Sequence, residues 1–177
     1  MQVLATPEVS MDDPVLSRRS IRKYTGEPVD DATVRRLLRA AMAAPSAGNQ
    51  QPWHFIVLRD RATLAQITEW HPYAKMLPSA PVAIIVCGDP GDAKWAVLWT
   101  QDCAACTENL LIEAELLGLG AVWLGIHPLP EREAALRGLL GIPETVVPFA
   151  IIPFGWPQER KEPSHRYDEA RIHTERW

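Results

Sequence analysis

The chain has 177 residues, of which 47% are hydrophobic and 23% are charged, and this composition is typical of a globular domain. We expect a single domain over residues 1–177. A net charge of -4 and a pI of about 5.7 argue against nucleic acid as the main partner. The longest apolar runs, such as residues 82–87, are too short to cross a bilayer, and we expect no membrane association.

The first residues lack the basic region and long apolar run of a signal peptide. The three cysteines form an odd, low count that does not predict a disulfide framework. Both observations predict a cytoplasmic protein.

Apolar periodicity, capping residues and turn signals divide the chain into helices and strands. We expect helices over residues 30–44, 94–117 and 130–140, and strands over residues 53–58, 81–88, 121–126 and 146–154. Pro148 and Pro153 in the last strand suit a strand at the edge of a sheet, or a bend. The pattern predicts an α+β domain in which helices bracket a small sheet.

The residues after Gly155 form a polar extension, 156–177, that is rich in Pro, Arg and His. One interpretation is a disordered tail. The other is a segment that wraps a partner subunit, because Tyr167, Ile172 and Trp177 are spaced apolar groups that need a surface to bury against.

Three guanidinium groups and a hydroxyl occur within five residues at Arg18, Arg19, Ser20 and Arg22. Arginine forks match the geometry of a phosphate group, and a neighbouring hydroxyl adds a donor. A solvated basic patch is the alternative. A cation of the extension, from Arg160, Lys161 or Arg166, could complete a phosphate site that begins at Arg18.

A loop of small and polar residues, 45–52, follows the first long helix. Small residues allow a ligand to approach the backbone, while Ser46, Asn49 and Gln50 offer hydrogen bonds. Such a loop suits the polar edge of a flavin ring, and an ordinary connecting loop is the alternative.

The glycine-rich stretch at residues 118–126 contains Gly-x-Gly but precedes a strand, whereas a dinucleotide-binding fingerprint follows a strand and opens a helix. We therefore reject a Rossmann interpretation. Gly118 and Gly120 are expected to end a helix, and Gly125 allows a backbone N–H to come close to a ligand.

Two other patterns could carry chemistry. Cys103 and Cys106 have redox-motif spacing but fall inside a helical pattern, which favours a buried packing role. The histidines show no metal-ligand spacing, and we expect no metal site. Asp102 and Glu108 are interpreted as caps or ion-pair partners.

The motifs RRSIRKY, PSAGNQQPWHF, AKML, GLGAVWLGI and PFGWP occur in this order and are followed by a basic tail. This arrangement resembles the nitroreductase family of FMN-dependent enzymes over residues 15–177. The resemblance implies a mostly antiparallel sheet flanked by helices, a homodimer with two FMN sites at the subunit interface, and a C-terminal extension that wraps the partner.

The resemblance also implies roles for individual residues. Arg18 and Arg166 hold the phosphate, Arg22 and Lys75 face the flavin pyrimidine, and Arg19 and Ser20 are further contacts. Pro45, Ser46 and Asn49 reach the flavin that the other subunit mainly holds. Trp123, Leu124 and Gly125 pass the flavin with their backbone, with the Gly125 N–H near N5. Some relatives have Asn where this chain has Pro72.

We expect an FMN-dependent oxidoreductase that transfers hydride from NAD(P)H through flavin N5 to a nitroaromatic, quinone or related small acceptor, without a catalytic side chain. A flavin carrier or sensor, or a flavin-fragmenting or dehalogenating relative, is the alternative. The segment at residues 61–78 has no pattern that identifies the acceptor.

Overall fold

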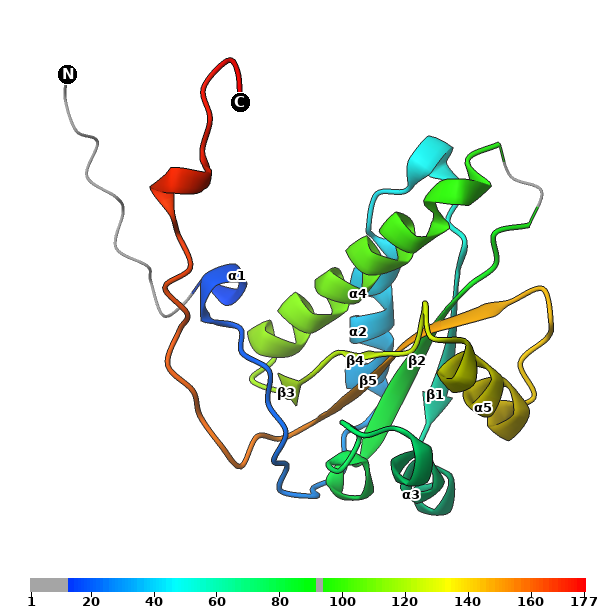
Figure 1. Cartoon of the computed structure of the whole chain (residues 1–177). Coiled ribbons are helices and arrows are strands. Elements are labelled where there is room, and N and C mark those ends of the chain that lie inside the picture. The colour runs from blue at the N-terminus through cyan, green and yellow to red at the C-terminus, as the bar shows by residue number, and fades with distance from the viewer. Residues whose placement is uncertain (1–12, 92–93) are drawn as a thin grey trace.

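The computed structural model describes residues 13–91 and 94–177 (Figure 1). The α-helices are α1 (Pro14–Ser17), α2 (Asp31–Met42), α3 (Arg61–Trp70), α4 (Trp99–Leu116) and α5 (Pro130–Leu140). The strands are β1 (Trp53–Leu58), β2 (Val82–Gly88), β3 (Gly120–Ala121), β4 (Leu124–Gly125) and β5 (Val147–Gly155). Short 3-10 turns are η1 (Ala47–Asn49), η2 (Leu77–Ser79), η3 (Ala96–Leu98) and η4 (Glu169–Arg171).

The strands form one antiparallel sheet in the order β1-β2-β5-β3, with β4 also paired to β5. Trp53 of β1 lies opposite Gly88 of β2, and Val82 of β2 lies opposite Phe154 of β5. The expected α+β class with a mostly antiparallel sheet is confirmed.

Helices cover both faces of the sheet (Figure 1). Side chains from one face, including Ile84 and Ile152, pack with the buried residues of α2 and α4. Side chains from the other face, including Ile85 and Ile151, pack with α3 and α5. Every residue of β2 is buried, because a strand covered on both faces has no polar side to alternate with its apolar one.

The helix expected over residues 30–44 is observed as α2. Its N-cap is Asp30, whose carboxylate accepts a hydrogen bond of 2.7 Å from the Thr33 N–H. The helix expected from residue 94 begins later, because residues 96–98 form the 3-10 turn η3 before α4 starts at Trp99.

The expected edge position of the last strand is wrong, since β5 lies inside the sheet between β2 and the β3–β4 edge. The alternative prediction, a bend in this strand, is partly confirmed. The pairing of β2 with β5 shifts by one residue beside Phe149, which follows Pro148.

Pro153 also splits the strand expected over residues 121–126. The Val122 N–H donates a hydrogen bond to the Pro153 carbonyl with an N···O distance of 3.4 Å, but proline has no N–H to return one. The two halves, β3 and β4, keep one register against β5, with Ala121 opposite Phe154 and Leu124 opposite Ile151.

Helix α3 lies in a segment for which we predicted no secondary structure. Asp60 caps it through Thr63, and its buried side chains are Leu64 and Ile67. Only these two positions are fully covered, so the apolar periodicity is weak, and the capping aspartate was the usable signal.

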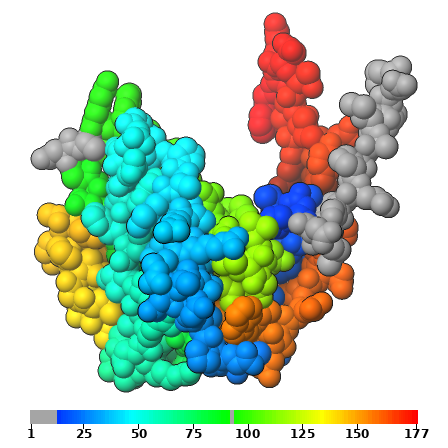
Figure 2. Space-filling view, turned by 180° about the vertical axis from the view of Figure 1, so that it is seen from behind, coloured from blue at the N-terminus to red at the C-terminus, as the bar shows by residue number. Residues whose placement is uncertain are grey.

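The first residues of the extension dock on the chain's own N-terminal segment. Trp156 accepts a backbone hydrogen bond from Thr25, and Gln158 donates one to Lys23. The Lys161 ammonium donates to the Ser20 carbonyl at 2.7 Å. Beyond this point the extension stands away from the body (Figure 2), with Tyr167, Ile172 and Trp177 exposed.

Two glycine substitutions test how tightly the N-terminal segment packs on β3. A Cβ on Gly120 would lie 2.5 Å from Cγ2 of Ile21, whereas a Cβ on the helical Gly138 would meet nothing within 4 Å. Gly120→Ala should therefore destabilise the fold by about 1–3 kcal/mol, because the segment must move. Gly138→Ala should be neutral or stabilise it by up to about 1 kcal/mol. Urea unfolding checks both, and equal midpoints would contradict the packing described.

Candidate functional site

A cavity of about 540 Å³ opens between the N-terminal segment, the loop after α3 and the strand β4. These three parts of the chain are far apart in sequence, and the sheet and α3 bring them together. The cavity is lined by Arg22, His71, Pro72, Tyr73, Lys75, Met76, Trp123, Leu124 and Gly125. Five of the residues that the sequence predicted for the site therefore share one cavity, namely Arg22, Lys75, Trp123, Leu124 and Gly125.

The cavity lining is cationic. Arg22 and Lys75 are exposed cations on its wall, and within residues 13–91 and 94–177 no carboxylate lines it. Such a wall favours a ligand that carries or develops negative charge.

The third wall of the cavity is an edge of the sheet. Ile126 donates its N–H to the carbonyl of Phe149, so the backbone groups of Gly125 and Trp123 point away from β5. The equivalent outward carbonyl of Ala121 is already bonded to the Ile21 N–H at 2.9 Å. Trp123 and Gly125 thus present backbone polar groups toward the cavity, and a ligand with a hydrogen-bonding edge could satisfy them.

A second cavity, of about 340 Å³, lies beside the N-terminal segment and contains Arg19. Arg160 and Lys161 of the extension line it together with the acidic side chains Glu115, Glu159 and Glu162. Glu159 accepts a hydrogen bond of 2.7 Å from the Arg22 backbone N–H, and this contact, with help from Lys161, lowers its pKa. The extension is therefore electrostatically fixed next to the basic motif.

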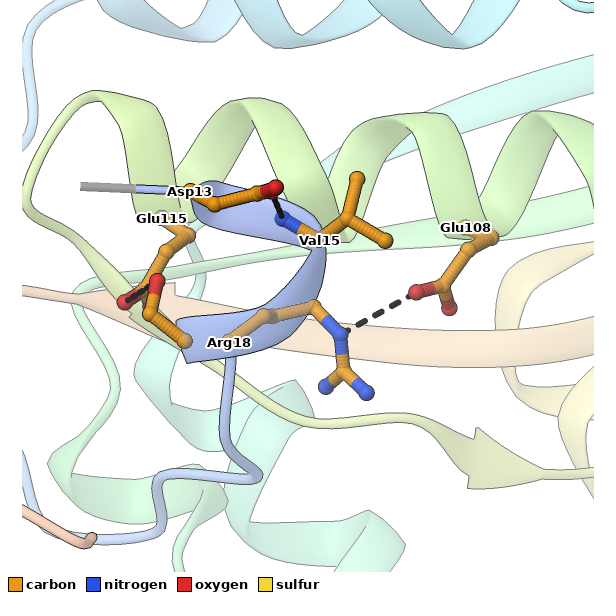
Figure 3. A network of polar contacts seen from close by, with 6 residues as sticks. Asp13, Val15, Arg18, Glu108 and Glu115 are labelled. Atoms are coloured by element: carbon orange, nitrogen blue, oxygen red, sulfur yellow. Dashed lines mark hydrogen bonds and ion pairs between the residues drawn. The ribbon is translucent and has the colours of Figure 1, made fainter. Parts of the chain in front are cut away.

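Arg18 does not line either cavity. Its Nε lies 3.1 Å from a carboxylate oxygen of Glu108 on α4, and Ser17 next to it donates to Glu115 at 3.0 Å (Figure 3). The expected partner role of Glu108 is observed. The pair with Glu108 uses only Nε, so the terminal nitrogens of Arg18 make no hydrogen bond within residues 13–91 and 94–177.

The remaining predicted residues lie outside the cavities. Ser20 forms an isolated β-bridge with Ala121, and its carbonyl oxygen accepts a hydrogen bond from Lys161. Arg166 is exposed on the extension. Pro45 and Asn49 are exposed on the loop before β1, and Ser46 is half-buried there.

This loop has a fixed and unusual conformation. Gly48, Asn49 and Gln51 have positive φ angles of 56°, 57° and 48°, and such angles are costly for residues other than glycine. The buried carboxylate of Asp102 holds the loop, since it accepts hydrogen bonds from the Ala47 N–H at 2.9 Å and the Gln50 side-chain amide at 2.6 Å. We had expected Asp102 to be a helix cap or an ion-pair partner. Within the described residues it instead supports the loop through these two hydrogen bonds.

The sequence did not point to His71, Tyr73 or Arg132. His71 is 1% exposed, and its Nε2 lies 3.1 Å from the Gly125 carbonyl oxygen. Burial is the main cause that lowers the pKa of His71, and the nearby Arg132 guanidinium acts in the same direction. No spacing rule could have found these residues, because they come from the loop after α3 and from α5.

The cysteine pattern has a structural role. Cys87, Cys103 and Cys106 are buried, and burial raises the pKa of the Cys87 and Cys106 thiols to about 12. Within the described residues no three His, Cys, Asp or Glu side chains gather in a way that could hold a metal ion. None of the helices in those parts of the chain is both long and apolar enough to cross a membrane.

Comparison with known proteins gives the family. The profile described as the nitroreductase family matches residues 15–71 and 66–156. The chain therefore belongs to the nitroreductase family and is an oxidoreductase enzyme.

Relatives match over most of their length. A protein of Archaeoglobus fulgidus, whose predicted activity is NADH dehydrogenase/NAD(P)H nitroreductase, is 48% identical over 92% of this chain and 96% of its own. A crystal structure from Parabacteroides distasonis with the same predicted activity has a TM-score of 0.89 at 40% identity, covering 93% of this chain and 96% of the other. An FMN-dependent nitroreductase from Clostridium difficile has a TM-score of 0.84 at 26% identity, covering 93% and 99%.

The thiols provide a test of the buried role of the cysteines. Because the thiolate is the reactive form and the pKa values are raised, the three thiols should not react with a thiol-specific dye at pH 8 in the folded protein. All three should react in guanidinium chloride. A dye that titrates two thiols of the folded chain would revive the redox interpretation.

Proposed function

We propose that this protein is an FMN-dependent oxidoreductase that passes hydride from NAD(P)H to a nitroaromatic, quinone or related small acceptor. The observation that carries the proposal is the cavity in which Arg22, Lys75 and the outward backbone of Gly125 meet. When bound, FMN would accept and release hydride at its N5 atom.

The residues of the cavity suit an isoalloxazine ring. A reduced flavin carries negative charge around N1 and O2, and Arg22 and Lys75 supply cations on that wall. Gly125 has no side chain, and a Cβ at this position would meet nothing within 4 Å. The space over the face of the sheet at Gly125 is therefore open to a planar ring.

The phosphate would lie toward the basic motif. Arg18 retains two terminal nitrogens for it, Arg19 and Ser20 follow directly, and Arg166 of the extension would supply a further cation. In this arrangement Glu108 orients the Arg18 guanidinium before the cofactor binds.

We propose further that the site is shared between two copies of the chain. Pro45, Ser46 and Asn49 do not line the cavity that contains Arg22, and their loop is nevertheless fixed in a costly conformation by Asp102. A loop held in this way could serve the flavin of a second subunit. Exposed apolar side chains on α1, α2 and α4 offer a surface for that subunit, namely Val15, Leu16, Met42 and Leu116.

The purified protein should be yellow and should release FMN rather than FAD when it is denatured. The reason is that one phosphate site is proposed and no fingerprint for a second nucleotide is present. Rapid bleaching by NADH or NADPH without air supports the oxidoreductase. A yellow protein that neither nicotinamide bleaches would instead be a flavin carrier or sensor.

Arg22→Gln should weaken FMN binding by about tenfold to a hundredfold, because it removes a charged contact worth about 1.5–3 kcal/mol. Arg35→Gln removes the same charge from an exposed position on α2 and should leave the affinity unchanged. Fluorescence titration of FMN measures both variants. Equal titration curves for the two variants would remove Arg22 from the site.

The protein should be a dimer that loses flavin when it dissociates. A chain that ends at Lys161 keeps the contacts of the extension with its own N-terminal segment but lacks Tyr167, Ile172 and Trp177. Since each large side chain buried in a partner contributes roughly 1.5–3 kcal/mol, the shortened dimer should be weaker. Sedimentation with detection of flavin absorbance compares the two chains. A full-length monomer that holds FMN tightly would rule out the shared site.

A further inference from the structure

The carbonyl oxygen of Gly125 accepts two hydrogen bonds from outside the sheet. One donor is Nε2 of His71, in the loop after α3, at 3.1 Å. The other is a terminal nitrogen of Arg132, on α5, at 2.9 Å. Two separate elements thus hold the Gly125 carbonyl, which lies at the wall of the cavity.

The hydrogen-bond network of His71 fixes its tautomer. Its Nδ1 accepts from the backbone N–H of Tyr73 at 3.3 Å, which leaves the proton on Nε2 to be donated to Gly125. Arg132 is the charged group close to this ring, and its guanidinium also lies 5.9 Å from the centroid of Tyr73. A neutral, buried His71 therefore acts as a directed donor.

Gly125 needs such a restraint. Glycine lacks the Cβ that limits the backbone angles of other residues, and on its outward side Gly125 has no neighbouring strand. Within a strand the N–H and C=O of one residue point to the same side. A clamp on the Gly125 carbonyl holds the peptide that follows Gly125, and it thereby restrains the backbone angles of Gly125 that set the direction of its N–H toward the cavity.

We infer that His71 and Arg132 are positioning residues that clamp the Gly125 carbonyl and so aim the Gly125 N–H at the ring of the bound cofactor. The part that concerns the cofactor rests on the proposed function. The clamp itself is a property of the chain without its cofactor. The two can therefore be tested apart.

The clamp is tested first without added flavin. The chain contains ten glycines, so labelling with ¹⁵N-glycine gives a small set of amide signals in which Gly125 can be assigned. Arg132→Met and His71→Leu should each shift the Gly125 signal and speed its amide exchange. Arg132→Lys and His71→Gln keep a donor at each position and should restore most of the original signal.

Arg137→Met is the matched control on the same helix. Arg137 donates to the carbonyls of Ile142 and Val146 and does not line the cavity. This variant should lose stability and leave the Gly125 signal in place. If Arg137→Met perturbs Gly125 as much as Arg132→Met does, the effect is general destabilisation and the clamp is wrong.

Titration with FMN then tests the consequence for the site. Arg132→Met and His71→Leu should bind FMN about tenfold more weakly, which corresponds to the loss of one well-aimed hydrogen bond. Arg132→Met should also make the flavin potential more negative, because a cation is lost near the ring. Unchanged affinity in both variants, with wild-type protein that binds FMN, would overturn the positioning role. Wild-type protein that binds no FMN while Gly125 responds as described would reject the proposed function and leave the clamp standing.

Discussion

A missing hydrogen-bond donor at Pro153 determines how the site is built. The central strand β5 pairs with β2 on one side and with an edge strand on the other, and Pro153 cannot return a hydrogen bond to Val122 of that edge. The edge strand is therefore interrupted between β3 and β4 while its register is kept. The interruption divides the edge into two parts with different partners.

The first part of the edge is covered by the basic N-terminal segment, and the second part is left facing the cavity. Ala121 bonds to Ile21 and so places Arg22 beside the cavity. Gly125 bonds to His71 and Arg132 through its carbonyl. In an ordinary sheet another strand would occupy this edge. Here the Gly125 carbonyl is taken by His71 and Arg132, while the outward N–H groups of Trp123 and Gly125 have no strand partner among the described residues and lie at the cavity wall.

Three carboxylates hold the loop and the N-terminal segment of the site in place, and one of them, Asp102, is buried. Asp102 secures a loop with three positive φ angles, Glu108 orients Arg18, and Glu159 bonds to the backbone of Arg22. Each of these acids acts on a neighbouring segment, and none of the three lines the cavity that contains Trp123 and Gly125. Among the described residues, the cations that line this cavity are Arg22 and Lys75.

The sequence by itself determined the family, the fold class and the elements with strong local signals. Helix α2 has a capping aspartate and a regular apolar face, and β2 is a continuous apolar run, so both follow from local rules. The family motifs also named five of the residues that line the cavity. Only the tertiary structure decided the rest. The central place of β5 and the break beside Pro153 depend on which strands pair, and the contacts of His71 and Arg132 with Gly125 join residues from separate elements. Periodicity describes how a segment meets the core, and it carries no information about which distant side chain will reach a given backbone carbonyl.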